Sequence, residues 1–214
     1  MSVTLGSNQP LFELGTTLKG TMTNDGTTTT INEQVLGTRH EFTDADFSGS
    51  SQPRLSGATI HAIALRNTSG ITLLGKRLVL LDVTAGRGRL KNADGYAHDS
   101  SIGLCVLVDP FLSSSGVVDD DIFWGIYKGP ALCLTPTVAA DFNAAITAGA
   151  PLVAATGTTS GNSTGGRVSM VTLPGQTGAT AAFSAAVNLV GYAMSARTTD
   201  ITNSDVLVDM AVRI

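Results

Sequence analysis

Short hydrophobic segments separated by turn residues fill most of the second half of the chain. Each is rich in Val, Ile, Leu or aromatic residues and is bounded by Gly, Pro, Asp, Asn or Ser. This pattern is typical of a mainly β fold, an antiparallel β-sandwich or barrel. The segments that we predict to be strands are 78–83, 102–108, 122–127, 131–134, 152–155, 168–173, 187–194 and 206–214.

The last of these segments alternates most clearly. Every second residue from Val206 to Val212 is apolar and falls on one face of a strand. The other face carries Leu207, Asp209, Ala211 and Arg213. Because side chains of a strand point to opposite faces in turn, this segment predicts a half-buried strand.

One segment, 136–148, has a helical pattern. Phe142, Ala145 and Ile146 are spaced at i, i+3 and i+4, Thr137 suits the N-cap, and Gly149 suits the C-cap. We therefore expect one short helix in an otherwise β protein.

An internal repeat relates residues of about 71–134 to residues of about 145–214. Each copy has a turn glycine, a strand, a Gly-Arg hairpin, a strand entered through glycine and a closing strand. The repeat predicts two related β units, and the alternative is convergent strand patterning. The matched blocks are Gly75/Leu78-Val79 with Gly149/Leu152-Val153, Gly88-Arg89-Leu90 with Gly166-Arg167-Val168, Ile102-Gly103-Leu104 with Val190-Gly191-Tyr192, and Ile122-Phe123-Trp124 with Val206-Leu207-Val208.

Residues 1–60 have a different pattern, with scattered apolar residues and no sustained period. Asn24-Asp25-Gly26, before the threonines at 27–30, is a hairpin signal. Since such a segment does not easily form its own core, we expect an extended N-terminal arm that lies on the body, residues 61–214, or on a neighbouring subunit. The arm residues that we expect to contact a partner are Phe12, Leu14, Phe42 and Phe47; the alternative is that they cap the protein's own sheet.

Composition excludes several classes of function. The 214 residues include 13 Lys and Arg against 17 Asp and Glu, a formal net charge of −4, which disfavours nucleic-acid binding through a basic face. Hydrophobic residues reach 43% and charged residues only 14%, the reverse of a disordered chain. The strongest apolar run is broken at Asp82, so we expect no membrane span. Residues 1–9 lack the basic and apolar regions of a secretory signal.

Catalytic and metal-binding patterns are weak. His40, His61 and His98 lie in unrelated contexts, and no Gly-x-Ser-x-Gly nucleophile motif occurs. Asp109 and the run Asp119-Asp120-Asp121 lack the spacing of a calcium loop, which favours a solvated turn. We therefore expect a protein that is not an enzyme and needs no cofactor or metal.

The 2 cysteines, Cys105 and Cys133, both lie in apolar strand-like segments. The chain has none of the cysteine density of a secreted disulfide scaffold. We interpret both as reduced core residues, with a cross-strand disulfide as the alternative.

The order of several blocks resembles that of tailed-phage head decoration (capsid cement) proteins. The resemblance covers about residues 60–214 and departs from the smallest of these proteins in the long N-terminal segment. Its motifs are short: Asn67-Thr68-Ser69-Gly70-Ile71-Thr72-Leu73 followed by Gly75-Lys76-Arg77-Leu78-Val79, then Ile102-Gly103-Leu104, Thr147-Ala148-Gly149-Ala150-Pro151-Leu152, Val190-Gly191-Tyr192-Ala193-Met194 and Val206-Leu207-Val208.

The resemblance implies a β-rich structural protein of the virion, located on the outer capsid surface and made in the host cytoplasm. It implies two partners, the major capsid protein and further copies of the chain in a homotrimer, and capsid stabilisation without enzymatic activity. Thr-, Ser- and Gly-rich loops support a second hypothesis, a phage tail or fibre component or a glycan-binding β module.

Overall fold

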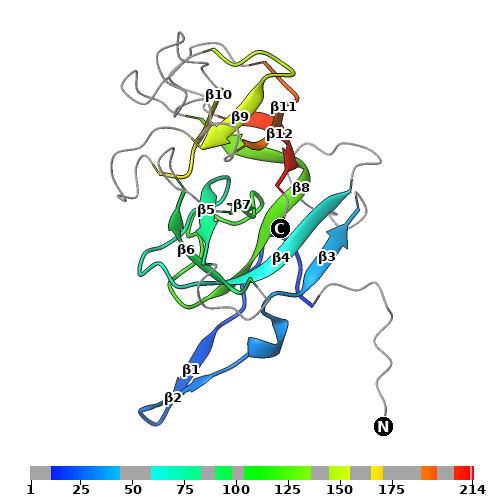
Figure 1. Cartoon of the computed structure of the whole chain (residues 1–214). Helices are drawn as coiled ribbons and strands as arrows, with labels where there is room; N and C mark the ends of the chain where they lie inside the picture. Colours follow the sequence, from blue (N-terminus) through cyan, green and yellow to red (C-terminus); the bar gives the residue numbers. More distant parts are fainter. Residues whose placement is uncertain are drawn as a thin grey trace.

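The computed structural model describes residues 11–43, 59–82, 90–97, 104–135, 145–154, 165–170, 189–196, 205–212 and 214. These residues form β-structure with one short 3₁₀-helix, which confirms the mainly β fold class (Figure 1). The elements are β1 (Thr21–Asn24), β2 (Thr27–Thr30), η1 (Glu33–Val35), β3 (Arg39–Phe42), β4 (Ile60–Asn67), β5 (Leu78–Leu81), β6 (Asn92–Tyr96), β7 (Cys105–Val108), β8 (Ile122–Leu134), β9 (Pro151–Ala154), β10 (Val168–Met170), β11 (Leu189–Ala193) and β12 (Asp205–Ala211).

Five strands close into a barrel in the order β4-β8-β7-β5-β6, with β6 paired back to β4. The pairs are antiparallel except β4–β6, which runs parallel through Arg66↔Asn92 and Asn67↔Ala93. The sheet is therefore mixed rather than wholly antiparallel, because closing the barrel brings β6 beside the end of β4 in the same direction.

The barrel interior is filled by one face of each strand. On β4, Ile63 and Leu65 belong to the interior cluster, whereas Ala62 and Ala64 belong to a second cluster outside it. Both faces of β4 are thus buried, so this strand carries a nearly continuous apolar run instead of a clean alternation. The interior cluster consists of Ile63, Leu65, Leu73, Val79, Leu81, Ala93, Tyr96, Val106, Val108, Val117 and Phe123.

Strand β8 is 13 residues long and belongs to both halves of the sheet. Its beginning pairs with β4 and β7, and its end, from Lys128 to Leu134, pairs with β12. The prediction of two separate strands here is wrong, because Gly129 continues the strand with a φ of 94°. A Cβ at Gly129 would lie 2.2 Å from the backbone oxygen of Thr59, so only glycine fits this close approach.

The strand order is the same in the two parts of the sheet. The first part runs β6-β5-β7-β8 and the second runs β10-β9-β11-β12, with antiparallel pairs throughout. The matched sequence blocks fall on corresponding strands: β5 with β9, and β8 with β12. Blocks at residues 88–89 and 102–103 lie outside the described residues.

Strand β12 has the predicted alternation. Val206, Val208 and Met210 are buried, whereas Asp205, Asp209 and Ala211 are exposed. The half-buried strand at the end of the chain is confirmed over Asp205–Ala211.

The predicted helix, 136–148, is wrong over residues 145–148, which are not helical. Its residues 136–144 lie outside the described part of the chain. Ala150 N–H donates to the Thr147 carbonyl at 3.1 Å, and Gly149 has a φ of 83°. These features make a turn that leads directly into β9, with Ile146 buried. A turn glycine and a helix C-cap glycine share the same backbone conformation, which is why the sequence was compatible with both.

Residues 11–43 join the body rather than forming a separate core. Strand β3 pairs with β4 from Arg39↔Ile63 to Phe42↔Ile60, at an edge of the large sheet. The hairpin β1–β2 instead projects away from the body (Figure 1). Strands β3, β4 and β6 were not among the predicted segments.

Candidate functional site

Two of the expected partner-contact residues are buried in the chain's own core. Phe12 is 8% exposed and Phe42 is 1% exposed, and both belong to the cluster outside the barrel. Leu14 is partly buried against the same cluster, and Phe47 lies outside the described residues. The placement of these side chains corresponds to the alternative in which they cap the protein's own sheet.

Trp124, the 1 Trp of the chain, organises these aromatic rings. Phe12 stacks on it with 4.5 Å between ring centroids, and Phe42 meets it edge-on at 5.4 Å. The indole N–H donates to the Phe12 carbonyl at 3.0 Å. The sequence placed Trp124 in a strand but had no signal for these partners, which lie far earlier in the chain, Phe12 by 112 positions.

Residues 11–19, which we call the strap, cross the body at the start of β8. In addition to the contacts of Phe12 with Trp124, two backbone hydrogen bonds join Leu18 of the strap to Ile122, at 2.9 and 2.7 Å. The Lys19 ammonium binds both oxygens of Asp121 at 2.9 and 3.0 Å. Gly15 N–H donates to a carboxylate oxygen of Asp109 at 2.6 Å.

The four aspartates that the sequence offered as a possible metal site each interact with another group of the protein. Asp119 accepts a hydrogen bond from Gly70 N–H at 2.8 Å, and Asp120 lies 3.6 Å from the Arg66 guanidinium. Asp109 and Asp121 hold the strap. Among the residues that the structure describes, no group of three or more His, Cys, Asp or Glu is arranged to hold a metal ion.

Asp109 is fully buried, unlike the solvated turn that its sequence context indicated. Its second oxygen accepts a hydrogen bond from Phe111 N–H at 2.9 Å. Burial raises the pKa of this carboxyl from 3.8 to about 7, opposed by the hydrogen bonds from Gly15 and Phe111. The fold therefore makes Asp109 harder to ionise than a solvent-exposed aspartate.

Both cysteines are buried and free. Burial raises the pKa of the Cys105 thiol to about 12 and also raises the pKa of the Cys133 thiol. Cys133 Sγ lies 4.0 Å from Met210 Sδ, within the apolar cluster. These side chains therefore act as small core residues rather than nucleophiles.

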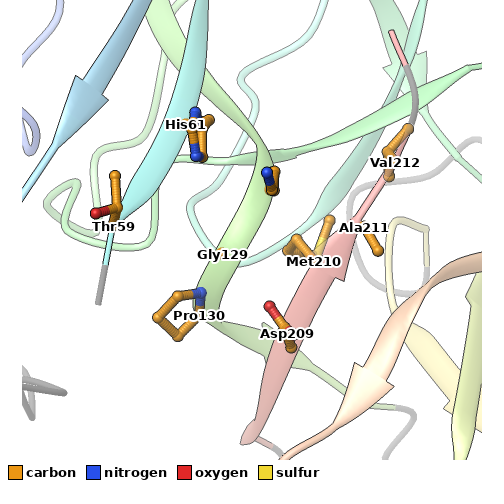
Figure 2. A pocket seen from close by; sticks show the side chains of 9 residues that line it. Thr59, His61, Gly129, Pro130, Asp209, Met210, Ala211 and Val212 are labelled. Atoms are coloured by element: carbon orange, nitrogen blue, oxygen red, sulfur yellow. The ribbon is translucent and has the colours of Figure 1, made fainter. Parts of the chain in front are cut away.

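An open hollow of about 600 Å³ lies where β4 and β12 meet β8 (Figure 2). Lys128 is opposite His61 in one pairing and opposite Ala211 in the other. His61 Nδ1 lies 3.1 Å from a Glu41 carboxylate oxygen, whereas Lys128 and Asp209 are exposed. The remaining lining residues are Thr59, Gly129, Pro130, Met210, Ala211 and Val212. An open site with charges of both signs suits a partner's side chain better than a small molecule, which needs deeper enclosure.

His40, the other histidine that the structure describes, lies in the aromatic cluster and does not line the hollow. His40 packs edge-on against Phe42 at 4.6 Å between ring centroids. His98 lies outside the described residues. The structure therefore brings His40 to the aromatic cluster and His61 to the hollow, without a shared partner in the described chain.

The hairpin β1–β2 is formed by local sequence alone. Its turn residues Asp25 and Gly26 have φ values of 48° and 77°, as in the primed two-residue turns that match strand twist. Thr23 and Thr28 face each other with hydroxyl oxygens 3.1 Å apart. Every hairpin residue after Thr21 is exposed, including Met22 at 59%. The hairpin signal in the sequence is confirmed.

Within the part of the chain that the structure describes, no helix is long and apolar enough to cross a membrane. Comparison of the chain with protein-family models, with curated proteins and with solved structures finds no match.

Proposed function

We propose that this protein is a structural virion protein that binds the outer surface of a phage capsid as a homotrimer and stabilises the shell by bridging neighbouring capsid subunits. The resemblance of blocks in residues 60–214 to head decoration proteins is its sequence basis. The structural observation that carries it is the projecting hairpin β1–β2. The proposal includes no catalytic activity.

The hairpin has the properties of a preformed contact element. Its side chains are Thr, Met and Asn apart from Asp25 and Gly26, so burying them against a partner desolvates a single charge. Its edges carry none of the Lys, Arg or Pro residues with which proteins commonly prevent strand pairing. An isolated two-stranded hairpin is only marginally stable in water, so a partner surface would add to its stability.

A repeating shell multiplies such modest contacts. When several identical sites are linked in one oligomer, each later contact forms at high effective concentration and the overall hold exceeds any single affinity. A homotrimer that presents three hairpins fits this requirement. Low overall charge also lets identical copies lie close together with little mutual repulsion.

The alternative of a glycan-binding module is less well supported. Such modules use exposed aromatic rings, but Trp124 is 1% exposed and its N–H is already bonded to Phe12. Tyr192, at 47% exposure, is the large aromatic side chain that the described surface offers. A single ring on a sheet face makes a weak platform for a sugar.

The test is co-sedimentation of the purified protein with mature heads of its own phage that lack the protein. We expect binding at micromolar concentration, a fixed copy number per shell subunit, and a mass three times that of the chain by light scattering. The hairpin variant Met22→Glu should weaken binding. The matched variant Tyr192→Glu, exposed on β11 in the other half of the sheet, should bind normally.

Met22→Glu lies on an exposed position opposite Thr29 and should leave the unfolding midpoint unchanged. Tyr192→Glu places a second carboxylate opposite Asp209, which costs about 0.2–1 kcal/mol, so both variants are compared at a temperature well below their unfolding midpoints. Failure of the unmodified protein to co-sediment would contradict the proposed function. Normal binding by Met22→Glu together with weakened binding by Tyr192→Glu would keep the function but move the contact to the second half of the sheet.

A further inference from the structure

Asp109 joins the strap to the barrel through a buried carboxylate. One oxygen accepts from Gly15 N–H on the strap at 2.6 Å, and the other accepts from Phe111 N–H on the body at 2.9 Å. Within the described residues these oxygens contact backbone N–H groups and no cation. The strap is thus held at one point by a group whose charge is neutralised by neither Lys nor Arg.

We propose that the strap, residues 11–19, is a releasable element whose attachment depends on the protonation of Asp109, and that its release uncovers the aromatic face formed by Trp124 and Phe42. The other fastenings permit such local release. Apart from Phe12, the strap's side chains are exposed or half-buried, and the Lys19–Asp121 pair has an exposed lysine. A segment with few buried side chains opens at a lower free energy than the core.

The sign of the pH dependence follows from burial. Closing the strap over Asp109 removes its carboxyl from water, and burial raises its pKa from 3.8 to about 7. When the pH lies between these two pKa values, Asp109 therefore takes up a proton as the strap closes. Attachment is tightest in acid, weakens as the pH rises towards 7, and is constant above that.

The variant Asp109→Asn keeps the other charged and titratable groups near the strap, so it separates their effect from that of Asp109. These groups are Glu13, Lys19, Asp121, Lys76 and His40, whose ring lies 6.2 Å from the Trp124 ring. Glu13 is exposed. The strap and body charges on the neighbouring elements are engaged as follows: Lys19 with Asp121, and Lys76 with Asp205. A tenfold difference in the acidity of Asp109 between the closed and the open strap corresponds to a tenfold change in the opening constant of the strap. The rise of the Asp109 pKa from 3.8 to about 7 therefore allows the opening constant of the strap to change by up to about a thousandfold.

Release would change the surface at one defined place. Phe12 stacks on Trp124 at 4.5 Å, and the Trp124 indole N–H is bonded to the Phe12 carbonyl. Lifting the strap exposes this ring face and frees its N–H donor. Because Trp124 is the 1 Trp in the chain, its fluorescence reports the strap without labelling.

The experiment measures acrylamide quenching of Trp124 in the full chain between about pH 4 and pH 8, with circular dichroism to show that the β-structure is unchanged. We expect quenching to rise with pH and to level off above the pKa of Asp109. Asp109→Asn should lose the part of the rise that depends on Asp109 and keep only any contribution of His40, whereas Glu13→Gln, on the same strap, should retain the full rise. The His40 ring lies 6.2 Å from the Trp124 ring, and Asp109→Asn keeps His40, so this variant separates imidazole quenching from strap release.

A second variant keeps the test decisive if Asp109→Asn does not fold. Gly15 has a φ of 82°, and a Cβ there would lie 3.2 Å from the Phe111 carbonyl oxygen. Gly15→Ala should therefore loosen the strap at every pH while keeping the rise with pH. A flat quenching profile in the unmodified protein, or an equal rise in Asp109→Asn, would overturn the proposal.

Discussion

Phe42→Ala is the substitution that best distinguishes a core residue from a partner anchor. Phe42 is 1% exposed and lies edge-on to Trp124 at 5.4 Å and to His40 at 4.6 Å. It also ends the β3–β4 pairing, opposite Ile60. If its side chain serves the chain's own core, its removal must lower the free energy of unfolding even when no partner is present.

The magnitude follows from the packing. Truncating a buried Phe to Ala lowers the free energy of unfolding by about 3–5 kcal/mol, a range that includes both the lost transfer free energy and the cost of the cavity. An edge-on aromatic pair contributes about 0.5–1.5 kcal/mol beyond its buried area, part of which is already in that range. We expect Phe42→Ala to lower the free energy of unfolding by about 4 kcal/mol. In a chain of this length it lowers the melting temperature by about 8–16 °C, at about 2–4 °C per kcal/mol.

The assay is urea unfolding of the free protein followed by Trp124 fluorescence, with Met22→Ala as the control. Met22 is 59% exposed on the hairpin, so its truncation should change stability by less than about 0.5 kcal/mol. The reasoning would be refuted if Phe42→Ala cost less than about 1 kcal/mol in the free protein while abolishing binding to phage heads. That result would make Phe42 a partner anchor.

Two further predictions concern the second half of the sheet and the thiols. Gly191→Ala should destabilise the protein by about 1–3 kcal/mol in thermal unfolding, because a Cβ there would lie 2.2 Å from the Asp209 backbone oxygen and must push β11 and β12 apart. An unchanged melting temperature would contradict this close approach. Cys105 and Cys133 should not react with a thiol reagent at neutral pH in the folded protein, since burial raises both thiol pKa values, and should both react in urea. Rapid labelling of either cysteine before unfolding would contradict their burial.

Features of the fold that depend on residues close together in the sequence were predicted, and features that depend on distant segments were not. The hairpin at Asn24-Asp25-Gly26 was predicted because two residues set its turn, and β12 because its alternation is complete over Asp205–Ala211. β4 was missed because both of its faces are buried. A strand that packs on two sides loses the alternation by which a strand is recognised.

The candidate site was predicted less well than the fold. Phe12 and Phe42 were recognised as apolar residues without a local core, which is correct for residues 11–43 taken alone. Their partner, Trp124, lies 112 positions after Phe12. Asp109 read as a turn residue because nothing near it in sequence indicates that Gly15, 94 positions earlier, binds it.

The sequence by itself determined the hairpin at residues 24–26, most strands of the second half of the chain, which face of the final strand is buried, and that the chain carries little charge. Those properties follow from side-chain period and composition, which act over a few residues. Only the tertiary structure decided that β6 closes a barrel against β4, that β8 serves both halves of the sheet, and that the strap is fastened at Trp124 and Asp109. A hydrophobic pattern specifies that a face must be buried, but which distant segment covers it depends on how all the strands pack at once.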